Sequence, residues 1–222
     1  YMHDNGGMND PGQDNTSHGL YWHDSIDCSG DPYCSVEGYG NLIANNIIEH
    51  NTAKGISGRF SAYGLIIANN TLAGNGAYGI DFAEFAHDMV FANNLFANNA
   101  HYKKGGDGTG IKLGAGTGFR LINNVFWNFW GGTGTISGTG YTGVGTKLVP
   151  SNAPVVVNAV DAVHVAGTPE IVADLAHVGW SNDYHLTPNS GAIGYAGPAY
   201  ATPYDFTGKC RDTAPDGGAY EY

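Results

Sequence analysis

Short apolar runs recur along this chain at a nearly constant spacing, and each run is bounded by Asn and Gly. Four such segments cover residues 40–51, 64–75, 88–99 and 119–129. Within them, Asn46, Asn70 and Asn94 follow one another at intervals of 24 residues, and Asn124 comes 30 residues later. A fixed period of this size is typical of a solenoid, in which each repeat forms one coil and packs on its neighbours.

A second apolar phrase keeps step with the first: HGLYW (18–22), KGISG (54–58), YGIDF (78–82) and TGIKL (109–113). Alternation in this phrase places one column of side chains inside: Leu20, Ile56, Ile80 and Ile111. A second segment supplies the pairs Leu42/Ile43, Leu65/Ile66, Met89/Val90 and Leu121/Ile122. A third supplies Ile47-Ile48, Thr71-Leu72, Leu95-Phe96 and Val125-Phe126. Three strands per turn of about 24 residues predict an all-β parallel β-helix whose equivalent residues stack along the axis.

The recurring Asn residues have a structural explanation. A stacked Asn can bond the backbone amides that a corner between strands leaves unpaired, and it tolerates a left-handed backbone. We therefore expect Asn46, Asn70, Asn94 and Asn124 to form an internal polar ladder.

The repeats resemble the right-handed parallel β-helix repeat superfamily over residues 1–130. Two later phrases, SNDYHLTPNSGAIGYAG (181–197) and DFTGKCRDTAPDGGAYEY (205–222), resemble the C-terminal ending of its secreted bacterial members. The resemblance implies a secreted or cell-surface protein on a scaffold that polysaccharide lyases share. No phrase of a specific enzyme family is present, so no catalytic residues are carried over.

The expected organisation is a run of coils over residues 1–130, followed by the last irregular coils and a C-terminal cap over 131–222. Because Tyr1 falls within a repeat, we expect these coils to be the C-terminal part of a longer solenoid. In the tail, Asp205, Arg211, Asp216 and Glu221 are expected to form a hydrogen-bonded cap that protects the open strand edges of the solenoid.

Composition narrows the partners. With nine Lys and Arg residues and a formal net charge of −11, the chain lacks the basic face that nucleic acid requires. No apolar run approaches the length of about 18 residues expected of a membrane span. A disulfide is predicted between Cys28 and Cys34, with two free thiols as the alternative, and Cys210 is left over. A bridge in so charge-poor a chain fits an extracellular protein.

Three long insertions, residues 6–17, 23–40 and 100–109, flank the strand that carries the Gly-apolar phrase. They are expected to wall a groove along the helix. Its floor would be the outward row Tyr21, Ser57, Asp81 and Lys112, with His23 and Arg59 in the next row. His18 and Lys54 stand at the strand entrance, Glu84 follows its exit, and Tyr102 and Lys103 lie in the third insertion. Stacked polar and aromatic groups in a long groove suit a polysaccharide.

Several chemistries remain open for this groove. β-Elimination of a uronate needs a base and a cation, for which Arg59, Lys112 or Lys54 are candidates beside Asp81 and His23. Ca²⁺ could be held by Asp10, Asp14, Asp81 or Glu84. Hydrolysis needs two carboxyls, for which Asp81 and Glu84 are the pair available in the groove.

The structural alternative is a surface ion pair between Asp81 and Lys112 with no chemistry. The sequence favours a secreted polysaccharide lyase first. A non-catalytic module of the cell surface or extracellular matrix, which binds glycan or self-associates, comes second, and a glycoside hydrolase third.

Overall fold

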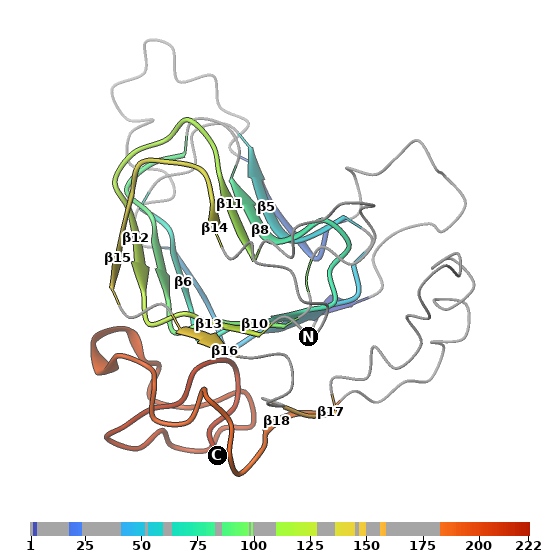
Figure 1. Cartoon of the computed structure of the whole chain (residues 1–222), viewed down its shortest axis with the longest axis vertical. Helices are drawn as coiled ribbons and strands as arrows, with labels where there is room; N and C mark the ends of the chain where they lie inside the picture. The colour runs from blue at the N-terminus through green and yellow to red at the C-terminus, as the bar shows by residue number, and fades with distance from the viewer. Residues whose placement is uncertain are drawn as a thin grey trace, which may run out of the picture.

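The computed structural model describes residues 2–3, 18–23, 41–51, 53–59, 64–82, 86–97, 99, 110–127, 136–144, 147–149, 156–158 and 183–222. Within them the chain winds through three parallel sheets, one strand per sheet in each turn, so the predicted parallel β-helix is confirmed. Viewed along the stack, the three sheets enclose a common core (Figure 1).

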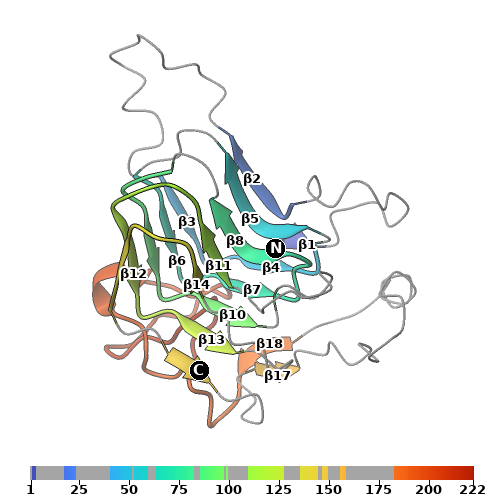
Figure 2. The ribbon, with the colours of Figure 1, turned by 45° about the horizontal axis from the view of Figure 1, so that its top comes forward.

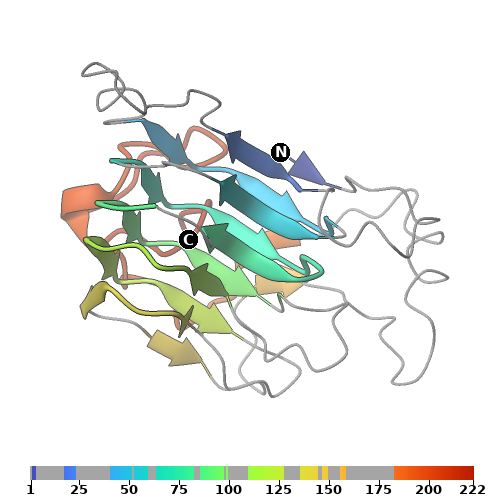
Figure 3. The ribbon, with the colours of Figure 1, turned by 90° about the horizontal axis from the view of Figure 1, so that it is seen from above.

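We number the three sheets of the solenoid I to III, in the order in which the chain passes through them within one coil. Sheet I contains β2 (Leu20–His23), β5 (Lys54–Arg59), β8 (Tyr78–Phe82), β11 (Ile111–Leu113) and β14 (Ile136–Ser137). Sheet II contains β3 (Leu42–Ala44), β6 (Ile66–Ala68), β9 (Val90–Ala92), β12 (Phe119–Ile122) and β15 (Tyr141–Val144). Sheet III contains β1 (Met2–His3), β4 (Ile47–Glu49), β7 (Thr71–Ala73), β10 (Leu95–Ala97), β13 (Val125–Trp127) and β16 (Lys147–Val149). Strands of successive coils lie side by side (Figure 3).

Each sheet contributes one column of side chains to the core. The column of sheet I is Leu20, Ile56, Ile80, Ile111 and Ile136, as the alternation predicted. Sheet II contributes Ile43, Ile67, Phe91 and Leu121, and sheet III contributes Ile48, Leu72, Phe96 and Phe126.

One predicted column needs correction. Leu42 was expected to be inward, but it is 58% exposed and belongs to the row Leu42, Ile66, Val90 and Arg120, in which Arg120 is also exposed. Strands of three or four residues in sheet II alternate strictly, so only one neighbour of each apolar pair can face the core. The residue before the strand, Leu65 or Met89, fills the remaining space and is fully buried.

The Asn ladder is confirmed at the corner between sheets II and III. The Nδ2 atoms of Asn46, Asn70 and Asn94 donate to Oδ1 of the next Asn in the series, which ends at Asn124, at 3.0–3.1 Å. That Oδ1 also accepts the backbone amide of the Asn below it. A second ladder of Asn51, Asn75 and Asn99 lies at the corner between sheets III and I.

The Asn that precedes each residue of the first ladder has a role outside the ladder. Asn45, Asn69, Asn93 and Asn123 have positive φ angles of 49–57°. Asn93 exchanges two hydrogen bonds with the backbone of Gly197, Asn69 accepts from the amide of Thr202, and Asn45 donates to the carbonyl of Tyr204. Residues 197–204 therefore run back along the solenoid, held coil by coil.

This segment belongs to an irregular C-terminal region, residues 183–222, that contains β18 (Asp183–Leu186) and the 3₁₀ turn η2 (Pro198–Tyr200). β18 pairs antiparallel with β17 (Val156–Asn158). The region was expected over the open end of the solenoid, but its described residues pack along the outer face of sheet III (Figures 1 and 2). Apolar side chains on that face, including Ile47, Leu95 and Trp127, cluster with Tyr184, Leu186 and Tyr220.

The four residues expected to form the cap are hydrogen-bonded to one another within this region, beside sheet III and not over the open end of the solenoid. The buried guanidinium of Arg211 donates to Glu221 at 3.0 Å and to the carbonyl of Gly218 at 2.8 Å. Asp205 accepts four hydrogen bonds, and Asp216 accepts the amides of Gly194 and Tyr222. These residues hold an irregular backbone in one conformation.

Candidate functional site

The register of sheet I brings the outward row together as the sequence indicated. Tyr21 pairs with Ser57, Ser57 with Asp81, Asp81 with Lys112, and Lys112 with Ser137. His23 and Arg59 are likewise paired at the ends of β2 and β5. Residues 116 positions apart in sequence (137 minus 21) thus share one ridge across five strands (Figure 2).

A glycine lies at or next to the first residue of four strands of sheet I, at the corner that leads into the outward row. Gly19, Gly55, Gly79 and Gly110 occupy equivalent corners. A Cβ at Gly79 would lie 2.7 Å from the Phe96 ring and 2.8 Å from the carbonyl oxygen of Gly110, so no larger residue fits without movement. The residues just before these glycines, His18, Lys54 and Tyr78, form an entry row beside the outward row.

Asp81 is the centre of this surface, and it is buried. The residue is 2% exposed, although it belongs to the outward row. Its Oδ2 atom lies 2.7 Å from Nζ of Lys54 and 4.0 Å from Nζ of Lys112. Its Oδ1 atom is buried and has no hydrogen-bond partner among the described residues. The expected surface pair of Asp81 and Lys112 is therefore a buried pair of Asp81 and Lys54, to which Lys112 is a more distant neighbour.

Together with the exposed Ser137, Lys112 and Tyr21 are the accessible members of the ridge. The side chain of Lys112 is 37% exposed, and its ammonium lies 4.9 Å from the centre of the Tyr78 ring, within the range of a cation–π contact. Tyr21 is 46% exposed and stacks on His18 with ring centres 5.2 Å apart. One partly exposed cation and one stacked aromatic ring thus face outward on the same sheet.

Comparison with protein-family models gives one match, the right-handed beta helix region, over residues 13–149. This match covers more than half of the 222 residues. The chain belongs to the right-handed β-helix family. No curated protein and no solved structure matches it. Membership fits carbohydrate-active and structural β-helix proteins alike.

The charge of this β-helix site favours an anion. Among the side chains that the structure describes there, two ammonium groups flank one carboxylate, a local excess of one positive charge in a chain whose formal net charge is −11. A cation such as Ca²⁺ would have to displace Lys54 from Asp81. No group of three or more His, Cys, Asp or Glu side chains suited to a metal occurs in the part of the chain that the structure describes.

Several predicted residues lie outside the described residues: Asp10, Asp14, Cys28, Cys34, Glu84, Tyr102 and Lys103. The predicted disulfide, the calcium ligands other than Asp81 and the carboxylate pair for hydrolysis therefore stay predictions. Only the backbones of His23 and Arg59 are described. Cys210 is a free, exposed thiol.

Tyr78, which contacts Lys112, was not singled out from the sequence. It precedes the glycine of YGIDF, at the position that Lys54 holds in KGISG, and the two residues are paired in register. That equivalence could have identified Tyr78 from the sequence.

In the described residues no helix is long and apolar enough to cross a membrane.

Proposed function

We propose that this β-helix is a secreted carbohydrate-active protein that binds an acidic polysaccharide along the outer ridge of sheet I and cleaves it by β-elimination. The observation that carries the proposal is the arrangement of Lys112, Asp81 and Lys54. An exposed ammonium stands beside a buried carboxylate that a second lysine already neutralises. The ridge therefore presents a net positive charge to a chain of uronates.

The two lysines divide into distinct roles. Lys54 is 15% exposed and its ammonium lies 2.7 Å from Oδ2 of Asp81, so it positions Asp81 and its charge is already balanced by that carboxylate. Lys112 is more exposed and lies 4.0 Å from Asp81, beyond hydrogen-bond distance. Lys112 is therefore the group that reaches the sugar.

In the proposed reaction, Lys112 binds the polymer as an ammonium ion, releases one proton to solvent, and then as the neutral amine takes the proton from C5 of a uronate. The electrons of that C–H bond form a double bond between C4 and C5, and the C4–oxygen bond breaks. The departing oxygen takes the proton that Lys112 has just gained, which restores the amine and leaves one new reducing end and one unsaturated uronate. Arg59 is assigned to the substrate carboxylate, whose neutralisation makes the C5 proton more acidic. Tyr21 is assigned to packing against a neighbouring sugar ring.

A non-catalytic glycan-binding module is the second candidate, and one observation favours it. The buried Lys54–Asp81 pair removes two of the ionisable groups on the ridge from direct chemistry. Such a module would keep the same ridge and bind the same acidic polymer without cleaving it.

The experiment is incubation of the protein with alginate, polygalacturonate and glycosaminoglycans, followed by ultraviolet absorbance of unsaturated uronate and by a reducing-end assay. Unsaturated product that is lost in Lys112→Ala and Arg59→Ala, and retained in Arg120→Ala, supports the lyase. Arg120 is a matched control because it is an exposed cation on sheet II. Binding without product favours the non-catalytic module. New reducing ends without unsaturation indicate hydrolysis and contradict the proposed reaction.

A further inference from the structure

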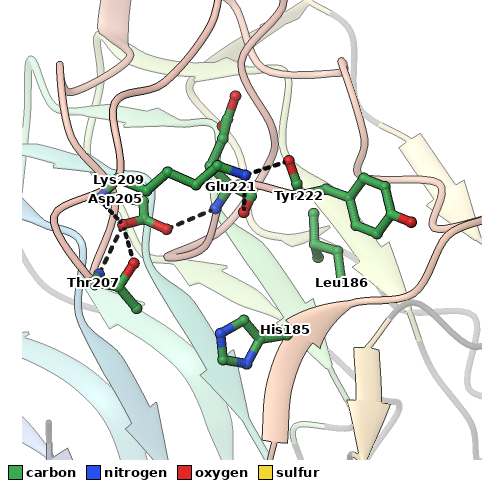
Figure 4. Close-up of a pocket in the computed structure, with 7 residues that line it drawn as sticks. All are labelled: His185, Leu186, Asp205, Thr207, Lys209, Glu221 and Tyr222. Carbon is green, nitrogen blue, oxygen red and sulfur yellow. Dashed lines mark hydrogen bonds between the residues drawn. The ribbon is translucent and has the colours of Figure 1, made fainter.

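A cavity lies in the C-terminal region, away from sheet I. It has a volume of about 320 Å³. Its wall combines β18 with the loop at residues 205–209 and the last two residues. The lining residues are His185, Leu186, Asp205, Thr207, Lys209, Glu221 and Tyr222 (Figure 4). The volume falls at the lower end of the range of small-ligand sites, about 300–1,000 Å³.

The two carboxylates in this lining are already satisfied by the protein. Asp205 accepts the amides of Thr207 and Lys209 at 2.8 Å, the hydroxyl of Thr207 at 2.7 Å and the amide of Glu221 at 3.1 Å. Glu221 is bound by Arg211 and by the amides of Asp212 and Asp216. Asp205 and Glu221 therefore shape the cavity and are not available to a ligand.

His185 supplies a flat ring at a fixed position. Alternation along β18 buries Tyr184 and Leu186 and turns His185 outward. The imidazole stacks on the ring of Tyr220 with centres 4.1 Å apart, and Phe206 packs edge-on against Tyr220 at 5.6 Å. The ring of His185 is thus held by Tyr220, which Phe206 contacts in turn.

Lys209 lies on the other side of the cavity from His185, with its ammonium directed toward Tyr222 (Figure 4). Its ammonium donates to the carbonyl of Tyr222 at 2.7 Å and, at 3.5 Å, to that of Glu221, which leaves the third N–H for a ligand. The Thr207 hydroxyl donates its hydrogen to Asp205, so its lone pairs remain as acceptors. The cavity therefore offers a donor, an acceptor and the apolar surfaces of Leu186 and the Lys209 stem.

From this combination we infer that the cavity binds one neutral sugar residue of a glycan. A pyranose has an apolar face of C–H groups that packs on a ring, and hydroxyls at its edge that both donate and accept. An acidic sugar fits less well, because the charges of Lys209 and Arg211 are balanced by those of Asp205 and Glu221. This site is independent of the ridge on sheet I and of its chemistry.

The test is calorimetric titration of the full chain with gluco-, manno-, galacto- and xylo-oligosaccharides and with oligouronates of similar length. The variants are His185→Ala and Lys209→Met, the second of which keeps most of the apolar stem while removing the charge. Tyr204→Ala is the matched control, since Tyr204 is a 53% exposed aromatic residue of the same region that does not line the cavity. Lys112→Met tests whether the ridge on sheet I contributes to the binding that is measured.

We expect at least one neutral oligosaccharide to bind saturably, with affinity reduced about tenfold or more in His185→Ala and Lys209→Met. Tyr204→Ala and Lys112→Met should bind it as the parent does. Absence of binding by every neutral oligosaccharide, or binding that both cavity variants retain, would overturn the inference. If His185→Ala unfolds at the assay temperature, Lys209→Met alone decides.

Discussion

The ammonium of Lys54 lies 2.7 Å from Oδ2 of Asp81, and the two side chains are 15% and 2% exposed. The two residues come from neighbouring coils of sheet I, on β5 and β8. Asp81 is buried and Lys54 is largely covered, which separates this pair from the ordinary ion pairs of a protein surface. A buried charge that loses its partner costs far more than an exposed one.

Removal of either partner should therefore destabilise the fold. We expect Asp81→Ala and Lys54→Met each to lower the free energy of unfolding by about 3 kcal/mol, the lower end of the range for broken buried pairs. Denaturant unfolding followed by circular dichroism measures the change. The control is His87→Ala, which breaks the exposed pair of His87 and Asp88 and should cost about 1 kcal/mol or less. Equal effects in all three variants would show that the Lys54–Asp81 pair is not buried in solution.

Arg211 should be irreplaceable by lysine. Its side chain is 2% exposed and bonds Glu221, Asn45 and several carbonyls at once, which a single ammonium cannot reproduce. Burial lowers the pKa of Arg211 while Glu221 opposes that effect, so the guanidinium stays charged. Arg211→Lys and Arg211→Met should each cost about 3 kcal/mol or more in unfolding free energy.

The readout that locates this effect is limited proteolysis. The strap at residues 197–204 should become the first site of cleavage in both Arg211 variants, because Arg211 also holds Asn45 at its far end. If Arg211→Lys resists proteolysis as well as the parent does, the role assigned to the several hydrogen bonds of the Arg211 guanidinium is contradicted.

Asp205 makes the C-terminal region sensitive to acid. Burial acts to raise the pKa of Asp205, but the hydrogen bonds from Thr207, Glu221 and Lys209 outweigh it and hold the pKa below the ordinary value of 3.8. A pKa depressed by folding means that the carboxylate stabilises the fold at neutral pH. That contribution is lost as the pH falls from about 3.8 through the lower folded value.

Asp205→Asn should therefore be less stable than the parent at pH 7, and the gap should narrow at pH values below about 3.8. Asp216 acts in the opposite sense, since burial raises its pKa and its protonation relieves a cost of folding as the pH falls. Thermal unfolding from neutral to acid pH measures both trends. A gap between parent and Asp205→Asn that stays constant over this range would contradict the linkage.

The corner glycines make a steric prediction. Gly79→Ala would place a methyl group 2.7 Å from the Phe96 ring and 2.8 Å from the Gly110 carbonyl oxygen, and should cost about 1–3 kcal/mol of unfolding free energy. Gly143→Ala is the matched control within a strand, because its nearest neighbour is the Leu121 carbonyl oxygen at 3.9 Å. Chemical denaturation of the two variants compares them directly, and similar stabilities would show that the corner is not tightly packed.

The solenoid could be predicted because its signal is local and repeated. Asn70 and Asn94 recur at the interval that one coil requires, and each finds its ladder partner directly above it. The register of sheet I followed from the same spacing, which is why Tyr21, Ser57, Asp81 and Lys112 could be placed on one ridge before any coordinates.

The position of the C-terminal region could not be predicted in the same way, because its contacts join distant residues without a period. Asn45 accepts a hydrogen bond from Arg211, 166 positions away in the sequence, and no repeat spacing predicts such a pair. One clue was present. The third segment carries apolar residues on consecutive positions, as in Leu95-Phe96, and a strand that is apolar on both faces needs a cover on its outer side.

Burial of Asp81 was also beyond the sequence. Alternation indicates the face on which a residue lies but not how deeply its neighbours cover it. Lys54 reaches Asp81 from the entry row of the adjacent coil, a diagonal contact that side-chain length decides and strand register does not.

The most direct test of the central claim, that the outer ridge of sheet I binds an acidic polysaccharide, is calorimetric titration of the protein with a soluble oligouronate. The parent and Arg120→Ala should bind with the same affinity, whereas Lys112→Met should bind about tenfold or more weakly, the loss expected for one charged hydrogen bond. Binding to the parent should also weaken as salt is added. Equal affinity in the parent and Lys112→Met, or no binding to any oligouronate, would contradict the account.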